Sequence, residues 1–359
     1  VTDDSLFEIG SISKPFAGLL LAKLVAEGVV TLESPLNDLL PTDIANILLN
    51  GKLVTLRHLV THAAGFLRGH PSGPLGCDLS WCPCDDTEEA FLHRIRVVAE
   101  EHELDTSIGY SNFALQVLAH ASGRAWNAPF PEFQKSLTDR LGLSNTWIGT
   151  VPEGIQTDCL TTGHLGGSPA NCCWDLGFCV NGLGSTLSSG KDLIQFLESI
   201  MDASDGSSST TGSIGSADSV LQEAIFQSLK PLHFEMPTSG LAHSWFFGQC
   251  ESDEGTVCNH DGSTEGFSAA AWFQPKTQTG FSAMSNCFGG ISGLASVCGV
   301  AEAINDRLFL VSEPLPSHLE NIREETQLVL PFLQKTLFSQ PQNKDRDVML
   351  AEGTCWIRI

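Results

Sequence analysis

The sequence predicts an α+β protein in which helices flank an antiparallel sheet, and a large, mostly helical lobe is inserted into that sheet. Two observations support this prediction. Helical periodicity dominates the first two thirds of the chain, whereas from residue 241 short apolar runs are separated by turn residues. Helices that precede the strands, rather than alternating with them, are typical of α+β folds. The two lobes would enclose a cleft.

The first helix is expected at 13–30, because Pro15 is tolerated only in the first helical turn. Further helices are expected at 87–103, 111–122, 128–141, 189–202, 293–308 and, amphipathic, at 317–338. Strands are expected at Leu241–Cys250, Thr256–Asp261, Phe267–Phe273, Gly280–Asn286 and, as a possible edge strand, Thr354–Ile359. The stretch 203–219, rich in Ser, Gly and Thr, predicts a surface loop.

Composition limits the possible partners. With 359 residues, of which 42% are hydrophobic, the chain can bury a large core. A net charge of −23 argues against a nucleic acid partner, because binding to phosphates needs a basic face. No apolar run is long enough for a membrane span. The expected partner is therefore a small molecule, and the oligomeric state stays open.

The chain holds 12 cysteines, which is many for an intracellular enzyme. Their even number and their clusters at 77–84 and 172–179 predict disulfides, and with them secretion or another oxidising compartment. Cys250 and Cys258 are expected to pair across adjacent strands. One alternative is that the thiols are free and buried.

A metal site is the other alternative for the first cysteine cluster. Its ligands would be His70, Cys77, Cys82 and Cys84. The chain has no Cys-x-x-Cys pair, and this spacing is irregular for zinc. We therefore expect neither a metal nor a cofactor.

A candidate nucleophile lies near the start of the chain. Ser11 and Lys14 are three residues apart, so in a helix that begins at Ser11 they share one face. An amine that accepts the proton of a serine hydroxyl activates that hydroxyl without a histidine, provided that the lysine is neutral. The structural alternatives are an N-cap serine and a solvated lysine.

Two further triplets follow in the chain. The first is Tyr110-Ser111-Asn112, which contains the single tyrosine, and the second is His260-Asp261-Gly262. With the Ser-x-x-Lys element, they resemble the pattern of serine β-lactamases and penicillin-binding proteins, in the branch of class C β-lactamases, DD-peptidases and esterases. Similarity to this branch extends over about residues 5–311 and includes the segments 55–65, 182–193 and 266–268.

The resemblance implies roles for the remaining site residues. Tyr110 would protonate the leaving group and activate water for deacylation, and Asn112 would hold Lys14 and the substrate amide. A half-buried aromatic and a helix N-terminal asparagine are the structural alternatives. However, a chain with 20 phenylalanines and 1 tyrosine seldom uses tyrosine for packing.

The third triplet would line the cleft on a strand. Gly262 would let a substrate approach the backbone, and the Ser263 N–H would form an oxyanion hole with the Ser11 N–H. His260 replaces the lysine that grips substrate carboxylates in relatives, so the expected substrates are uncharged esters or amides. Acidification would make His260 cationic and narrow that preference. The structural alternative is a strand histidine with satisfied hydrogen bonds.

The implied organisation is a β-lactamase-like catalytic domain at 1–311 and a C-terminal extension at 312–359 with one helix and a possible edge strand. The sheet lobe would comprise 1–12 and 241–311, and the helical lobe 13–240. Relatives carry further strands and a helix ahead of the nucleophile. We therefore expect either a fragment or processed form, or another segment that covers this edge of the sheet.

The expected function is a serine hydrolase that acts through an acyl-enzyme on an ester or amide. An acyltransferase would use the same residues, and a non-catalytic binding protein on this scaffold is the third possibility. A Ser-His-Asp hydrolase is disfavoured, because the chain has no Gly-x-Ser-x-Gly elbow. His62 is interpreted as structural, because the resemblance places its turn away from the cleft.

Overall fold

The computed structural model describes a large part of the chain. The described residues are 2–40, 53–66, 88–89, 91–92, 95, 108–148, 160–165, 168–169, 181–204, 218–249, 255–264, 266–288, 347–349 and 355–358. Most of the helix expected at 87–103 and all of those expected at 293–308 and 317–338 lie outside these ranges, as do His70, Cys77, Cys82 and Cys84.

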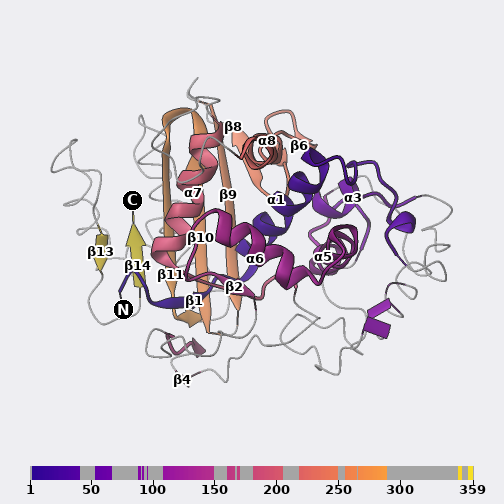
Figure 1. Cartoon of the computed structure of the whole chain (residues 1–359). Helices are drawn as coiled ribbons and strands as arrows, with labels where there is room; N and C mark the ends of the chain where they lie inside the picture. Colours follow the sequence, from indigo (N-terminus) through magenta and orange to yellow (C-terminus); the bar gives the residue numbers. More distant parts are fainter. Residues whose placement is uncertain are drawn as a thin grey trace.

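Eight antiparallel strands form the main sheet, in the order β13-β14-β11-β10-β9-β8-β7-β6 (Figure 1). Their bounds are His233–Met236 for β6, Ser239–Leu241 for β7, Phe246–Gln249 for β8, Thr256–Thr264 for β9, Phe267–Gln274 for β10, Thr279–Ser285 for β11, Asp347–Met349 for β13 and Cys355–Arg358 for β14. The antiparallel sheet with helices confirms the predicted α+β class.

The sheet differs from the prediction at both of its ends. It begins with the β6–β7 hairpin at His233, ahead of the predicted lobe boundary at 241. The N-terminal strand β1 (Leu6–Glu8) does not join it but pairs with β5 (Thr186–Ser189). The edge of β11 is paired with β14 from the end of the chain, where the sequence had predicted a possible edge strand at Thr354–Ile359. The partners β1 and β5 are distant in sequence, so local patterns could not identify their pairing.

The remaining strands of the described residues form two small sheets. The first has the order β1-β5-β2, with β2 at Trp147–Ile148. The second has the order β12-β3-β4, with β3 at His164–Leu165, β4 at Ser168–Pro169 and β12 at Cys287–Phe288.

The helices gather against one side of the main sheet (Figure 1). Their bounds are Ser13–Ala26 for α1, Leu56–Val60 for α3, Asn112–Trp126 for α5, Phe130–Arg140 for α6, Gly190–Ser204 for α7 and Ser219–Ser228 for α8, and the 3₁₀ turns are η1 (Gly10–Ile12), η2 (Leu36–Asp38) and η6 (Pro275–Thr277). Helix α7 packs on β10, β11 and β14, while α1 contacts α5, α6 and α8. Sequence periodicity did not predict α8.

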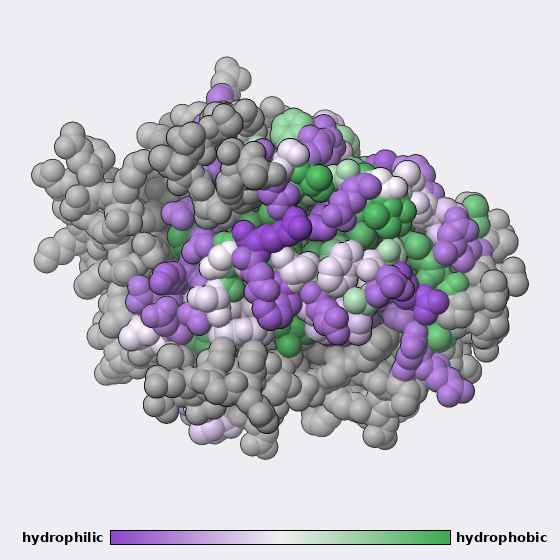
Figure 2. Space-filling model, viewed as in Figure 1, coloured by the Kyte–Doolittle hydropathy of each residue, from purple (hydrophilic) through white to green (hydrophobic). Residues whose placement is uncertain are grey.

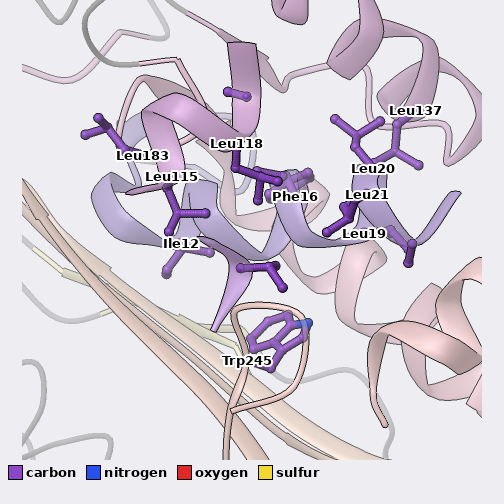
Figure 3. Close-up of a cluster of buried hydrophobic side chains, with 14 of the residues drawn as sticks. Ile12, Phe16, Leu19, Leu20, Leu21, Leu115, Leu118, Leu137, Leu183 and Trp245 are labelled. Atoms are coloured by element: carbon purple, nitrogen blue, oxygen red, sulfur yellow. The ribbon is translucent and has the colours of Figure 1, made fainter. Parts of the chain in front are cut away.

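Helix α1 is the centre of the core. Every residue from Ser13 to Leu24 is buried, so the helix has no solvent-facing polar stripe in that stretch. Figure 3 shows its residues Phe16 and Leu20 among leucines of α5 and α6. The same burial encloses Lys14 and Lys23, and buried lysines are rare unless they have partners.

The viewed face of the molecule is mixed in polarity. Figure 2 shows hydrophilic residues over much of its described surface, with small apolar areas between them. Of the helices in the described ranges, none combines the length and the apolar character that crossing a membrane requires.

Candidate active site

Ser11 lies in the 3₁₀ turn η1, just ahead of α1. The α-helix therefore begins at Ser13 and not at Ser11, as the sequence had suggested. Ser13 Oγ donates to the Gly10 carbonyl over 2.7 Å and accepts from the Thr186 N–H over 3.1 Å. These bonds tie the turn to β5, and Ser11 is left free of any capping role in α1.

Two side chains converge on the Ser11 hydroxyl. Lys14 Nζ donates to Ser11 Oγ over 2.8 Å, and Tyr110 Oη donates to the same oxygen over 2.8 Å. Lys14 Nζ also lies 4.9 Å from the centre of the Tyr110 ring. The structure therefore brings together the three residues predicted to be catalytic, and both groups lie within the range of direct proton transfer.

The Lys14 amine is held by the backbone and not by Asn112. It donates to the Leu183 carbonyl over 2.8 Å, and its side chain is completely buried. The predicted hydrogen bond from Lys14 to Asn112 is not formed, since Asn112 Oδ1 is buried and accepts no hydrogen bond from any described residue. A carbonyl acceptor leaves no trace in side-chain patterns, so sequence could not have identified Leu183.

Strand β9 brings the third triplet against the Ser11 turn. A Cβ on Gly262 would lie 2.0 Å from the Ile9 carbonyl oxygen and 2.9 Å from the Ser11 nitrogen. A Cβ on Gly10, whose φ is +50°, would lie 2.5 Å from the Ser263 nitrogen. Glycine at 262 therefore makes room for the Ser11 turn and not, as predicted, for a substrate. The backbones of Ser11 and Ser263 adjoin, as an oxyanion hole requires.

His260 is buried, and the centre of its ring lies 6.4 Å from that of Tyr110. Its Nδ1 lies 2.7 Å from the Asp261 carbonyl oxygen, which can only accept, so Nδ1 carries the proton and Nε2 is bare. Burial, and then the charge of Lys14, lower the pKa of His260 to about 3. The expectation that mild acidification makes it cationic is therefore wrong.

His62 lies against Tyr110, contrary to the expectation that its turn is remote from the cleft. The two rings stack with their centres 4.7 Å apart and their planes at 28°. His62 Nδ1 accepts from the Ser111 N–H over 3.1 Å, so Nε2 carries the proton of this ring. Burial, followed by the charge of Lys14, lowers the pKa of His62 well below its ordinary value.

Cys258 on β9 is a buried, free thiol, and burial raises its pKa to about 12. The strand register places Phe247, and not Cys250, opposite it. The predicted Cys250–Cys258 disulfide is therefore wrong. Among the residues that the structure describes, no group of histidine, cysteine and carboxylate side chains could hold a metal ion.

An antiparallel sheet with a buried central helix, and a serine flanked by lysine and tyrosine at the start of that helix, define the β-lactamase-like class of folds. The model of the beta-lactamase family matches residues 1–296 of this chain. The chain therefore belongs to the β-lactamase family.

A solved structure shows the same fold. The β-lactamase/D-alanine carboxypeptidase of Pseudomonas syringae superposes with a TM-score of 0.68 at 21% identity, over 88% of this chain and 86% of that one.

Two curated relatives match in sequence. The D-alanyl-D-alanine-carboxypeptidase/endopeptidase AmpH of Escherichia coli K12 is 28% identical over 47% of this chain and 43% of its own length. The esterase EstB of Burkholderia gladioli is 38% identical over 18% of this chain and 16% of its own. Each match spans less than half of the relative.

Proposed function

We propose that the protein is a serine hydrolase that forms an acyl-enzyme at Ser11 and passes the acyl group to water. The convergence of Lys14 Nζ and Tyr110 Oη on Ser11 Oγ, each over 2.8 Å, carries this proposal. A hydroxyl with two proton-transfer partners on a buried helix start is an activated nucleophile. The relatives named for β-lactamase, carboxypeptidase and esterase activity support the same class of reaction.

In acylation, Ser11 Oγ bonds to the substrate carbonyl carbon while its proton passes to Lys14 in its neutral amine form or to Tyr110 in its phenolate form. The carbonyl oxygen gains negative charge, which the adjoining N–H groups of Ser11 and Ser263 would stabilise. The bond to the leaving group then breaks, and Tyr110 returns a proton to the departing oxygen or nitrogen. In deacylation a water molecule attacks the acyl carbon and gives its proton to the same groups. The bond to Ser11 Oγ then breaks, and the proton returns to Ser11.

Asn112 offers a hydrogen-bond acceptor that a bound substrate could use. Its Oδ1 is buried and has no hydrogen-bond donor among the described residues. A buried acceptor without a partner costs about 1–3 kcal/mol. An N–H group of a bound amide substrate would supply the missing donor, so Asn112 contributes to substrate binding and not to the support of Lys14.

The substrate is proposed to be a small, uncharged ester or amide. His260 stays neutral because its pKa is about 3, so it offers a substrate carboxylate no charge. Burial is the main cause of the lowered pKa of both His260 and His62, and the nearby Lys14 adds to it. A net charge of −23 adds long-range repulsion of anions and also disfavours nucleic acid.

Labelling with a fluorophosphonate probe tests the nucleophile. Wild type should be labelled at Ser11, and Ser11→Ala should lose both the label and the hydrolysis of a nitrophenyl ester. Ser13→Ala is the matched control, because Ser13 is completely buried and bonded to Gly10 and Thr186. It should keep the label while losing about 1 kcal/mol of stability. Retained labelling of Ser11→Ala would overturn the assignment.

The proposed location is secreted or in another oxidising compartment. The cysteine clusters at 77–84 and 172–179 support it through their number and spacing. Disulfides would join cysteines other than Cys258, which is a free thiol.

A further inference from the structure

Tyr110 lies in a segment without regular secondary structure. Residues 108–111 precede α5, whose first turn is capped by the Ser111 hydroxyl. A proton-transfer group must hold its position closely, because a displacement of about 1 Å can cost roughly 100-fold in rate. Something other than a helix or strand must therefore fix the phenol.

His62 holds this segment on both sides of Tyr110. The His62 carbonyl accepts from the Gly109 N–H over 2.9 Å, and its Nδ1 accepts from the Ser111 N–H over 3.1 Å. Its ring stacks on the Tyr110 ring between these two bonds. One residue therefore binds the backbone before and after the tyrosine and also covers the tyrosine ring.

The backbone of His62 shows that this arrangement has a cost. Its φ is +57°, in the left-handed region that glycine occupies readily. It follows the last turn of α3, where glycine is the usual residue. A histidine there gives up backbone stability of about 1 kcal/mol or more. In return, this position carries an imidazole ring, which glycine could not provide.

We propose that His62 is a positioning residue of the proposed hydrolase, which fixes the Tyr110 phenol against Ser11 through two backbone hydrogen bonds and ring stacking. We infer that it acts through Tyr110, because its hydrogen bonds and its ring stacking are made with the Gly109–Ser111 segment. Helix α3, which carries the turn, packs against α5, so both partners are anchored to the same pair of helices (Figure 1).

A double-mutant cycle on the full chain tests this coupling. His62→Gly and Tyr110→Phe should each lower kcat for a nitrophenyl ester by about 100-fold, with a much smaller change in KM. If His62 acts through Tyr110, the double variant should be at most a few-fold slower than Tyr110→Phe alone. Losses that multiply in the double variant would overturn the proposal.

Two conservative variants separate the contributions. His62→Asn keeps an acceptor near the Nδ1 position and tolerates positive φ, so it should recover much of the lost kcat. His62→Phe keeps a ring but removes the acceptor that His62 Nδ1 offers to the Ser111 N–H, so it should recover less. His58→Ala is the control on the same helix, because His58 caps α3 by accepting from the Thr55 N–H. Any fold-loss of kcat in His58→Ala should multiply with the fold-loss in Tyr110→Phe when the two are combined.

A measurement without turnover keeps this inference separate from the proposed hydrolysis. Because the chain has 1 tyrosine, ring-labelled ¹³C-tyrosine gives NMR signals from Tyr110 alone. Wild type should show one sharp set, and His62→Gly should shift and broaden it, while His58→Ala leaves it in place. An unchanged spectrum in His62→Gly would overturn positioning even in an active enzyme. Absence of hydrolysis in wild type would overturn only the proposed function.

Discussion

The Lys14 amine donates to Ser11 Oγ over 2.8 Å from one turn along the chain, and it has no exposed surface. Burial excludes the water that would otherwise solvate a lysine, and a cation so enclosed is costly. A buried amine that touches the nucleophile is therefore placed for proton transfer. Helix α1 offers a second buried lysine for comparison, Lys23, which is paired with Glu27.

Lys14→Met should abolish most turnover. Methionine fills a similar volume without an amine, so kcat/KM for an ester should fall by about 10²–10⁴-fold. Lys23→Met should keep kcat/KM within a few-fold of wild type, because Lys23 contacts Glu27 and Phe133 and not the site. Steady-state kinetics and thermal melts of both variants check this. Similar losses of activity in both would show that general damage to α1, and not proton transfer, explains the effect.

Gly262→Ala should damage both the fold and activity. The added Cβ would lie 2.0 Å from the Ile9 carbonyl oxygen, so β9 or the Ser11 turn must move. We expect a loss of about 1–3 kcal/mol, as for overpacking in a core, with loss of activity from the displaced Ser263 N–H. Urea unfolding measures the first effect, and ester hydrolysis the second.

Gly248→Ala is the matched control for this substitution. Gly248 lies on the adjacent strand β8, and a Cβ there would meet no atom within 4 Å. Stability should stay the same or rise by about 0.4–1 kcal/mol, because alanine restricts the unfolded chain. Equal destabilisation at both glycines would contradict the steric explanation.

The sequence predicted the parts of the fold and site that depend on short-range spacing. Ser11 and Lys14 are neighbours by helical period, and the strands of β9–β11 alternate with turn residues. The roles of Leu183 and Gly262 depend on backbone contacts between distant segments, which side-chain identity does not encode. The pairing of β1 with β5 likewise joins distant segments, whereas the C-terminal strand β14 was predicted from its own residues.

The histidines show the same limit. Near Ser11, His260 was found by its motif, but its charge state depends on burial that only the fold defines. His62 was seen but misjudged, because a left-handed turn after α3 swings its ring onto Tyr110. A histidine where a helix would ordinarily end in glycine was the one available signal.

Substrate preference should not depend on pH in the mildly acidic range. With a pKa of about 3, His260 stays neutral, so the ratio of kcat/KM for a nitrophenyl ester to that for nitrocefin, which carries a carboxylate, should favour the ester. That ratio should be flat from about pH 7.5 to about pH 5. His260→Gln, which has no imidazole to titrate, should give a parallel profile. A ratio that falls on acidification in wild type alone would show that His260 becomes protonated.

Stability should fall on acidification below the ordinary histidine pKa of 6.5. Burial lowers the pKa of His120 and His243 to about 4 and of His260 to about 3, and it lowers that of His62 as well. Between these values and 6.5 the unfolded chain binds more protons than the folded one. The contribution of these histidines to stability is thus complete above pH 6.5 and is lost as the pH falls toward 4, by about 1.4 kcal/mol per pH unit for each histidine.

Urea unfolding at several pH values checks this. His243→Gln should make the slope of the unfolding free energy against pH shallower by one proton. A slope that is flat or of opposite sign would contradict the buried, neutral histidines.

Alkylation before and after denaturation should distinguish Cys258 from the other cysteines. Cys258 is buried and its pKa is raised to about 12, so an alkylating reagent should not modify it in the native protein. After denaturation without reductant, Cys258 should react, while the proposed disulfides keep the total below 12. Peptide mass spectrometry of differentially alkylated protein identifies each site. Reaction of all 12 cysteines would contradict both the proposed disulfides and the proposed oxidising compartment. An unreactive Cys258 in denatured protein would show that it forms a disulfide after all.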